Sequence, residues 1–489
     1  MVDLVVRGGT VVTADGSREL DVAIADGRIT ALGPELPGGR DEVDARGLIV
    51  LPGAIDVHLH FNEPGRTAWE GASTGSRALA AAGGTLFFDM PMNSTPAVVD
   101  EHAFDRKRTA LERVSVTDFA LWGGLTRDSL AAMPALADRG VVGFKAFMCD
   151  SGVPDFPRAD DTVLLEGCHQ ARRLGLPVAV HAESEELLQA LSRHIDIRDA
   201  RDFAASRPVA AEIDAIRRAL ELAGDTGVRL HIVHVSSGRG VALAAEARRG
   251  GVDVSIETCP HYLFFTQEDM ERLGAVAKCA PPLRSPAEQH GLWHAVLANE
   301  VDLVASDHSP ADPALKALPF DRAWGGIAGV QSTLSVLLDR GHHARGLSLQ
   351  RIAGLTATTP GRRFRIAGKG SIAVGHDADL ALVALNECCT LEPRHLHQRH
   401  KLSPYCGHTF RGVVRRTVRR GETIFDAAYA VGPGMGRFVR PLRLSTRDLS
   451  VQSSHASPRA SSPVVPARPA LSFAAMHGAT AHSDEQSSR

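Results

Sequence analysis

Ala54-Ile55-Asp56-Val57-His58-Leu59-His60-Phe61 follows an apolar run and the turn Pro52-Gly53, and it predicts a short buried strand. Side chains alternate between the two faces of a strand, so His58 and His60 point the same way. Two imidazoles at the end of a strand are suitable ligands for a metal ion. Taken alone, the pair fits two hydrogen-bonded structural histidines better. The rest of the chain has to decide between these alternatives.

The overall composition is that of a soluble globular protein with no strong charge. The 489 residues include 54 Lys and Arg against 57 Asp and Glu, which gives a formal net charge of −3. This balance disfavours nucleic acid and membrane surfaces as partners. Seven scattered cysteines, the lack of a signal peptide and the lack of an apolar run of about 20 residues favour a reducing cytoplasm.

Strand-like and helix-like segments alternate through the middle of the chain. Amphipathic stretches such as 161–174 and 209–223 separate the strand-like segments, and their apolar residues recur at helical spacing. The strand-like segments are 54–61, 85–90, 118–122, 141–148, 177–181, 229–235, 252–258 and 301–307. Eight such units predict an α/β fold, a TIM-type (β/α)8 barrel, to which we assign residues 51–369.

Both ends of the chain have a different texture from the middle. Residues 1–50 and 370–440 are rich in β-forming segments and turns, and we expect them to join in one small β-sandwich domain beside the barrel. Residues 441–489 are rich in Ser, Ala, Pro and Arg. We expect this tail to be disordered and dispensable for chemistry, with a partner-binding tail as the alternative.

Residues suited to metal chemistry recur at the carboxyl ends of the predicted strands. In a barrel these ends form one rim, where the active sites of TIM-barrel enzymes lie. The residues in question are His58, His60, Lys145, His181, His234 and Asp307. The ordered set speaks against chance clustering and predicts a metal centre.

Lys145 lies in the apolar stretch Gly143-Phe144-Lys145-Ala146-Phe147. Burial of an unpaired ammonium costs several kcal/mol and lowers the lysine pKa. The free amine can then capture carbon dioxide as a carbamate, whose two oxygens can bridge two metals. The alternative is an ion pair with a nearby carboxylate such as Asp89. The four histidines and Asp307 at the same rim make us favour the carbamate.

Several motifs resemble those of the amidohydrolase superfamily, in its cyclic-amidase branch of dihydroorotases, hydantoinases and allantoinases. The resemblance covers about residues 2–435, and its finer motifs are similar to those of allantoinases. These motifs are Asp56-Val57-His58-Leu59-His60-Phe61-Asn62-Glu63-Pro64-Gly65-Arg66, Phe144-Lys145-Ala146-Phe147-Met148-Cys149, Glu257-Thr258-Cys259-Pro260-His261-Tyr262-Leu263, Lys278-Cys279-Ala280-Pro281-Pro282-Leu283-Arg284, Ser306-Asp307-His308-Ser309-Pro310 and Ala323-Trp324-Gly325-Gly326-Ile327-Ala328-Gly329.

The resemblance implies a binuclear metal site that hydrolyses allantoin to allantoate. One metal would be held by His58, His60, Asp307 and carbamylated Lys145 (N6-carboxylysine), and the other by Lys145, His181 and His234. Zinc is the first choice, with cobalt, manganese or iron as alternatives. A hydroxide shared by the two metals would attack the ring amide, and Asp307 would act as general base and then general acid. The resemblance also implies a homotetramer.

The resemblance and the local sequence suggest five substrate contacts. They are the side chains of Asn93 and Ser309, the backbone of Ala280 and Gly325, and His261. A structural role for His261 is an equal alternative. We expect His231 and His308 to be structural.

Two positions discriminate within the branch. Asn62 stands where dihydroorotases have an arginine, and Asp150 stands where hydantoinases have a tyrosine. Asp150 also departs from the allantoinase pattern, so the sequence does not define the role of the loop that carries it. A hydantoinase, dihydropyrimidinase or dihydroorotase-like enzyme is the alternative function. A non-catalytic scaffold is disfavoured because all six ligand positions are filled.

Overall fold

Parallel strands at the centre of the molecule form the barrel in the computed structural model, which describes residues 1–427 and 435–443. Each of the eight predicted strands has a counterpart, so the expected barrel is confirmed. The strands are β6 (Ala54–Leu59), β7 (Gly84–Asp89), β8 (Asp118–Leu121), β9 (Gly123–Gly124), β10 (Phe144–Phe147), β11 (Val178–His181), β12 (Leu230–Ile232), β13 (Val254–Thr258) and β14 (Leu303–Val304).

The barrel closes between its first and last strands. The amide of His60, just after β6, donates to the carbonyl of His308, after β14, at 2.8 Å. β8 and β9 are two pieces of one strand, interrupted at Trp122, whose amide bonds to Asp89 O at 3.1 Å. The strands are buried on both faces, which explains why they read as continuous apolar runs rather than alternating patterns.

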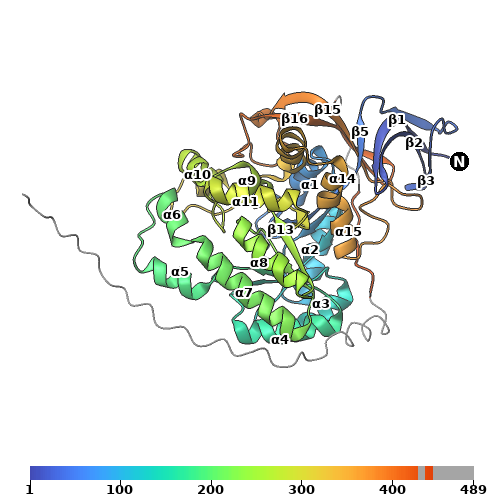
Figure 1. Ribbon diagram of the computed structural model, residues 1–489. Coiled ribbons are helices and arrows are strands. Elements are labelled where there is room, and N and C mark those ends of the chain that lie inside the picture. Colours follow the sequence, from blue (N-terminus) through green and yellow to red (C-terminus); the bar gives the residue numbers. More distant parts are fainter. Residues whose placement is uncertain (428–434, 444–489) are drawn as a thin grey trace, which may run out of the picture.

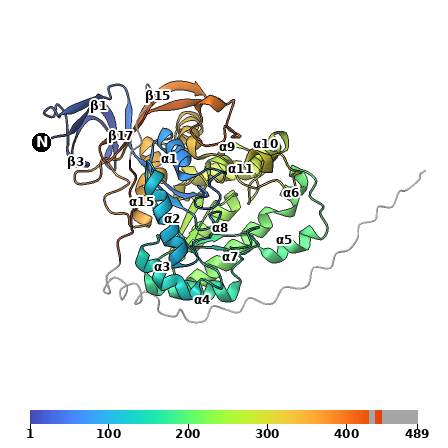
Figure 2. The ribbon, with the colours of Figure 1, turned by 180° about the vertical axis from the view of Figure 1, so that it is seen from behind.

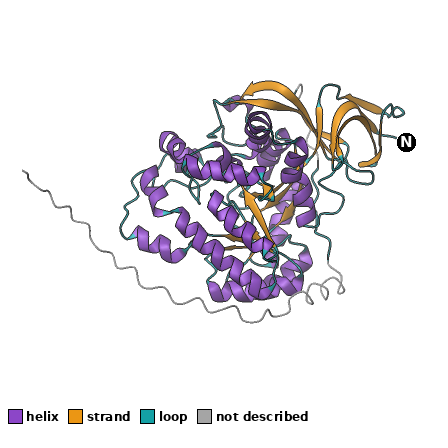
Figure 3. Cartoon of the chain, in the orientation of Figure 1, coloured by secondary structure: helices purple, strands orange, loops and turns teal. Residues whose placement is uncertain are grey.

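Helices surround the barrel strands on the outside (Figure 3). Helix α7 follows Pro208 and ends at Thr226, and the next residue, Gly227, has a φ of 67°, which suits a glycine after a helix. The helices are α1 (Ala72–Ala81), α2 (Glu101–Val114), α3 (Met133–Arg139), α4 (Asp161–Leu174), α5 (Glu185–Ser192), α6 (Ala200–Ser206), α7 (Val209–Thr226), α8 (Gly238–Arg249), α9 (Pro260–Phe264), α10 (Gln267–Leu273), α11 (Pro286–Leu297), α12 (Pro313–Lys316), α13 (Thr333–Val336), α14 (Leu349–Ala353) and α15 (Thr359–Arg363). None of these described helices is long and apolar enough to cross a membrane.

The two ends of the chain share one sheet, as the sequence predicts. Its order is β17-β16-β15-β5-β1-β2-β3, and β4 pairs with β1. The strands are β1 (Leu4–Thr13), β2 (Gly16–Ala25), β3 (Arg28–Gly33), β4 (Asp41–Asp44), β5 (Ile49–Pro52), β15 (Leu380–Thr390), β16 (Thr409–Arg419) and β17 (Glu422–Asp426). β5 joins the halves, because it pairs in parallel with β1 and antiparallel with β15.

This β domain lies at one side of the barrel, next to α1 (Figures 1 and 2). It has a core of its own, to which both ends contribute, for example Val6, Val22, Leu380 and Val418. A core drawn from both ends explains why neither end alone carries a complete hydrophobic pattern.

Residues 435–443 return from the β domain to the barrel. The amide of Val439 donates to Phe119 O at 2.7 Å, and the amide of Phe119 donates to Arg437 O at 3.0 Å. Residues 435–440, which the sequence assigns to the β domain, therefore extend the edge of β8. The predicted tail lies outside the described residues from residue 444 onward.

Candidate metal centre

The six predicted metal ligands come together at the carboxyl end of the barrel. All except Asp307 are at most 5% exposed, and the Asp307 side chain is 13% exposed. His58 lies in β6, His60 just after β6, Lys145 in β10, His181 at the end of β11, His234 after β12 and Asp307 after β14. The six residues predicted from the strand ends are therefore far apart in the sequence but close together in the structure.

His58, His60 and Asp307 form the first group of potential ligands. The Nε2 atoms of His58 and His60 lie 3.3 Å and 3.5 Å from the same oxygen, Asp307 Oδ1. The ligand atoms of the three residues lie within 4.8 Å of one another. One ion between them could contact all three.

His181 and His234 form the second group. His181 Nδ1 lies 3.0 Å from His234 Nε2, and the ring centroids of His58 and His234 are 5.3 Å apart. The two groups are therefore neighbours, and their free nitrogens converge at the same rim of the barrel.

Lys145 is 1% exposed, and its ammonium has no hydrogen-bond partner among the described residues. An ion pair with Asp89, the alternative considered from the sequence, is wrong. Asp89 lies 3.3 Å from Lys107 Nζ instead, and Lys107 also donates to Met90 O at 2.6 Å. Burial lowers the pKa of Lys145 to about 7, which leaves much of the amine unprotonated near neutral pH.

His60, His181, His234 and Asp307 are also in the protonation states that bind metals. Burial lowers the pKa of His60 to about 4, and it also lowers the pKa values of His181 and His234. Burial acts to raise the pKa of Asp307, but the charge of His58 and the hydrogen bond with His60 outweigh it and hold this pKa well below its ordinary value. Neutral imidazoles and an ionised carboxylate are what a divalent cation requires.

Glu257, in β13, organises the histidines from behind. Its Oε1 accepts hydrogen bonds from His58 Nδ1 at 2.7 Å and from the His234 amide at 3.1 Å, and its Oε2 lies 3.0 Å from His231 Nε2. Burial disfavours its charge, but His58 and His231 outweigh burial and lower its pKa to about 2. A carboxylate on the far nitrogen of a ligating histidine fixes the tautomer and the ring orientation. His231, also bonded to Ser255, is structural as expected.

Glu183 has the same relation to the second group. Its Oε2 lies 2.8 Å from His181 Nε2 and also pairs with Arg207. This leaves His181 Nδ1 free to face the site. Sequence analysis missed both carboxylates. For Glu183, its position two residues after His181 was a usable signal, because residues at that spacing share a face of a strand.

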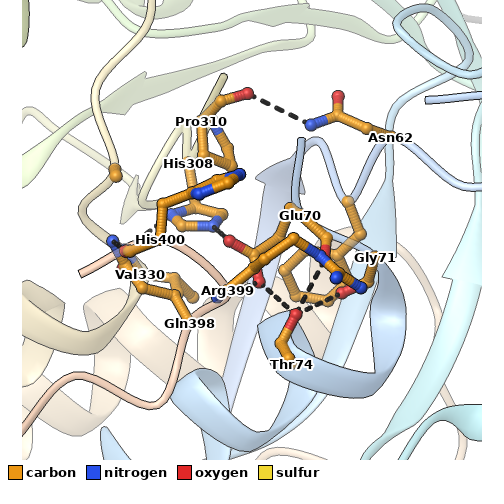
Figure 4. A network of polar contacts seen from close by, with 12 residues as sticks. Asn62, Glu70, Gly71, Thr74, His308, Pro310, Val330, Gln398, Arg399 and His400 are labelled. Atoms are coloured by element: carbon orange, nitrogen blue, oxygen red, sulfur yellow. Dashed lines mark hydrogen bonds and ion pairs between the residues drawn. The ribbon is translucent and has the colours of Figure 1, made fainter. Parts of the chain in front are cut away.

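His308, next to Asp307, is held between the backbone and a buried carboxylate (Figure 4). Its Nδ1 accepts from the amides of Gly329 and Val330 at 3.1 Å and 3.3 Å, so Nε2 carries the proton. Nε2 lies 3.6 Å from Glu70 Oε2, while Glu70 Oε1 accepts from the amide of Arg399 at 3.0 Å. The β15–β16 connection of the β domain thus supports the strand end that carries Asp307.

Several residues at the site have left-handed backbone conformations. The φ angles are 62° at Asn62, 70° at Asn93, 39° at His234 and 42° at Asp307. Such conformations cost of order 1–3 kcal/mol each and persist only where the surroundings enforce them. Here the bond from the His234 amide to Glu257 is one such restraint. Strained backbone at two predicted ligands is typical of a functional site.

A cavity of about 610 Å³ opens onto the metal-ligand cluster. Four of the five predicted substrate contacts line it, namely Asn93, Ala280, Ser309 and Gly325. His261 does not. It is 1% exposed and lies beside Cys259 and Asp307, and neither of its ring nitrogens has a hydrogen-bond partner among the described residues, unlike a structural histidine that bonds a neighbouring loop. Asp150 lines the cavity, and its amide donates to Glu185 Oε2 at 2.7 Å.

The donor set fits metal ions. Three buried polar atoms of the predicted ligands, His60 Nδ1, His234 Nδ1 and Lys145 Nζ, have no hydrogen-bond partner in the described protein. The nitrogens that face the site are brought close to one another or to Asp307, and carboxylates hold two of the rings from behind. The barrel and this rim together form a candidate metal centre of the kind that metal-dependent hydrolases use.

The chain belongs to the amidohydrolase family, whose model matches residues 49–424. Metal binding is typical of that family, in line with the ligand groups described above. The chain is 61% identical over 447 residues to an allantoinase of Solibacter usitatus, an alignment that covers 90% of this chain and 97% of the relative. It is 55% identical to an allantoinase of Rubrobacter xylanophilus, with 90% and 98% covered.

Solved structures agree with the fold. The L-hydantoinase (dihydropyrimidinase) from Arthrobacter aurescens superposes with a TM-score of 0.87 at 31% identity, covering 90% of this chain and 100% of that chain. The cyclic-amidase branch inferred from the motifs is therefore confirmed.

Proposed function

We propose that this protein hydrolyses the cyclic amide of allantoin and releases allantoate, a step in the breakdown of purine-derived ureides. The observation that carries the proposal is the convergence of four histidines and Asp307 on one cavity, with the buried, unpartnered Lys145 at the same end of the barrel. The allantoinases at 61% and 55% identity support the choice of ring.

Two divalent ions would occupy the site, with zinc as the first choice and cobalt, manganese or iron as alternatives. His58, His60 and Asp307 would hold one ion, and His181 and His234 the other. Lys145, as the carbamate formed with carbon dioxide, would contribute to both. When bound, the ions supply Lewis acidity to the amide carbonyl and lower the pKa of the attacking water. The unpartnered amine of Lys145 supports the carbamate, because a neutral amine is the form that reacts with carbon dioxide.

Asp307 would carry the proton in this reaction. Its low pKa keeps the carboxylate ionised at neutral pH, so it can accept a proton from the attacking water and pass it to the leaving ring nitrogen. The contacts of Oδ1 with His58 and His60 fix the position of the carboxylate.

The lining of the cavity suits a neutral ring that is rich in amide edges. The Asn93 amide lies 3.4 Å from Ser309 Oγ, so two polar side chains meet on one wall. The backbone of Ala280 and Gly325 would supply further contacts. Phe147 and Met92 give the cavity an apolar side that can pack on the plane of the ring.

Hydantoin and dihydroorotate are the competing rings. The likeness to hydantoinase structures, at 28–31% identity, supports hydantoin as a competing substrate. Against the second, Asn62 occupies the arginine position of dihydroorotases and donates through Nδ2 to Pro310 O at 3.2 Å (Figure 4). This position therefore provides no cation for a substrate carboxylate.

Turnover of allantoin, hydantoin and dihydroorotate, with metal content read on the same sample, tests the proposal. We expect allantoin to be the best substrate, with about two metals per chain. Lys145→Ala should lose both activity and metal, whereas the exposed Lys401→Ala should keep both. Metal binding with no allantoin turnover would refute the ring assignment. Turnover that survives Lys145→Ala would refute the carbamate.

We further propose that the enzyme is a homotetramer in the cytoplasm. The family resemblance supports the assembly, and the seven unpaired cysteines support a reducing compartment. Light scattering on the purified protein should give the mass of four chains, and a monomeric mass would refute the assembly.

A further inference from the structure

Two facing segments, 274–280 and 318–326, form one side of the substrate cavity. Their nearest backbone link is the bond from the Gly326 amide to Lys278 O at 2.7 Å. The segments carry Ala280 and Gly325, whose peptides line the cavity. Gly325 has open space where a Cβ would lie, so its peptide is accessible to a bound ring. The position of these peptides therefore depends on what holds the segments together.

Lys278 crosses from the first segment to the second. Its side chain is buried, at 5% exposure for the residue, and its ammonium donates to Phe320 O at 2.5 Å and to Ala323 O at 2.8 Å. The rings of Phe203 and Phe320 lie 5.0 Å and 5.1 Å from the same nitrogen. The ammonium is thus surrounded by carbonyl oxygens and aromatic faces, which stabilise a cation without a counterion.

Lys316, at the end of α12, reaches the same two segments. Its ammonium donates to Ala275 O at 2.9 Å, to Trp324 O at 2.9 Å and to Gly326 O at 2.5 Å. No carboxylate of the described residues lies within ion-pair distance of Lys278 or Lys316. Burial lowers the pKa of Lys278 to about 8, against the opposing effect of the Asp321 charge, and burial lowers that of Lys316 to about 7.

Such an arrangement fixes backbone direction. Each ammonium has three N–H donors and draws several carbonyl oxygens toward one point. The carbonyls of Trp324 and Gly326, on either side of Gly325, both turn toward Lys316. The peptides of Gly325 are then oriented from both sides and presented to the cavity.

We propose that Lys278 and Lys316 are positioning residues that set ring specificity by holding the peptides at Ala280 and Gly325 in place. This inference rests on the proposed function, since it names what selects the ring at that same site. A rigid array of backbone donors and acceptors discriminates between cyclic amides that differ in their ring substituents. An array that shifts would lose contacts with the ureido side chain of allantoin but keep those with the bare ring.

Lys278→Met and Lys316→Met test the inference, because methionine keeps an unbranched side chain and removes the ammonium. We expect kcat/KM for allantoin, relative to hydantoin, to fall about tenfold in each variant. The change should lie in KM, with metal content as in the wild type. Arg365→Met is the matched control, since Arg365 Nη2 also donates to a backbone carbonyl, Gly175 O at 2.7 Å, but at the opposite end of the barrel.

Folded variants that keep the wild-type ratio within about twofold would overturn the inference. If a methionine variant does not fold, the corresponding glutamine variant, which keeps N–H donors but no charge, is measured in the same way. Hydrogen exchange of residues 318–326 gives a readout that does not depend on activity. It should accelerate in the lysine variants and stay unchanged in Arg365→Met. An enzyme that opens only another ring would refute the proposed function, while exchange would still test the two lysines.

Discussion

Glu257 offers the sharpest test of how the metal centre is built. Glu257→Ala removes the acceptor of three buried donors, namely His58 Nδ1, His231 Nε2 and the His234 amide. A buried donor left without a partner costs about 1–3 kcal/mol. We therefore expect the free energy of unfolding of the metal-free protein to fall by about 3 kcal/mol or more.

Glu257→Gln separates charge from shape. The amide oxygen can still accept from His58 and His234, and His231 can change tautomer because Ser255 Oγ, 2.9 Å from its Nδ1, both donates and accepts. The stability loss should be smaller than for alanine. Without the carboxylate, His58 becomes a weaker ligand, and metal affinity should fall about 10–100-fold.

Urea unfolding of the metal-free protein and competition with a chelator measure the two effects. Ser255→Ala is the matched control, because it removes one bond to His231 without touching a ligand. It should cost about 1 kcal/mol and leave metal affinity unchanged. A Glu257→Gln protein with wild-type metal affinity would refute the reasoning that this carboxylate tunes His58.

Three further predictions follow from buried charges. At fixed dissolved carbon dioxide and with metal supplied in excess, the metal-free protein should regain activity about tenfold faster at pH 8 than at pH 6. The reason is that the neutral fraction of Lys145 rises through its pKa of about 7. Equal rates would contradict the carbamate. Glu70→Gln should lower kcat several-fold with little change in KM, since it weakens the support of the strand end that carries Asp307. Steady-state kinetics measures this, and an unchanged kcat would contradict the prediction. Lys369→Met should destabilise the protein by about 3–5 kcal/mol in urea, because Asp118 and Asp379, each 2.7 Å from its ammonium, lose their shared cation; a loss below about 1 kcal/mol would contradict this.

The sequence predicts the barrel and the six candidate ligands because both depend on local patterns. His58 and His60 share a face by strand parity, and the carboxyl ends of parallel strands meet at one rim whatever the connections between them. The same rule about strand ends is enough to predict the positions of His181, His234 and Lys145.

Apart from Glu183, the supporting residues could not be predicted, because their roles depend on neighbours across the fold. Glu257 can hydrogen-bond to His58 only because the barrel closes and brings their strands together. Glu70 accepts a hydrogen bond from the amide of Arg399, which belongs to the β domain. Lys107 as the partner of Asp89 could not be predicted either, since the sequence does not show which lysine reaches a given strand end.

The position of β5 in the shared sheet has a consequence for biosynthesis. β5 leaves the ribosome early, but its partner β15 follows only after the whole barrel has been made. Until then β5 presents a free strand edge, which is a template for pairing with other chains. Truncated products that end before Leu380 keep this edge open. We expect such truncated chains to aggregate more readily than the full-length protein.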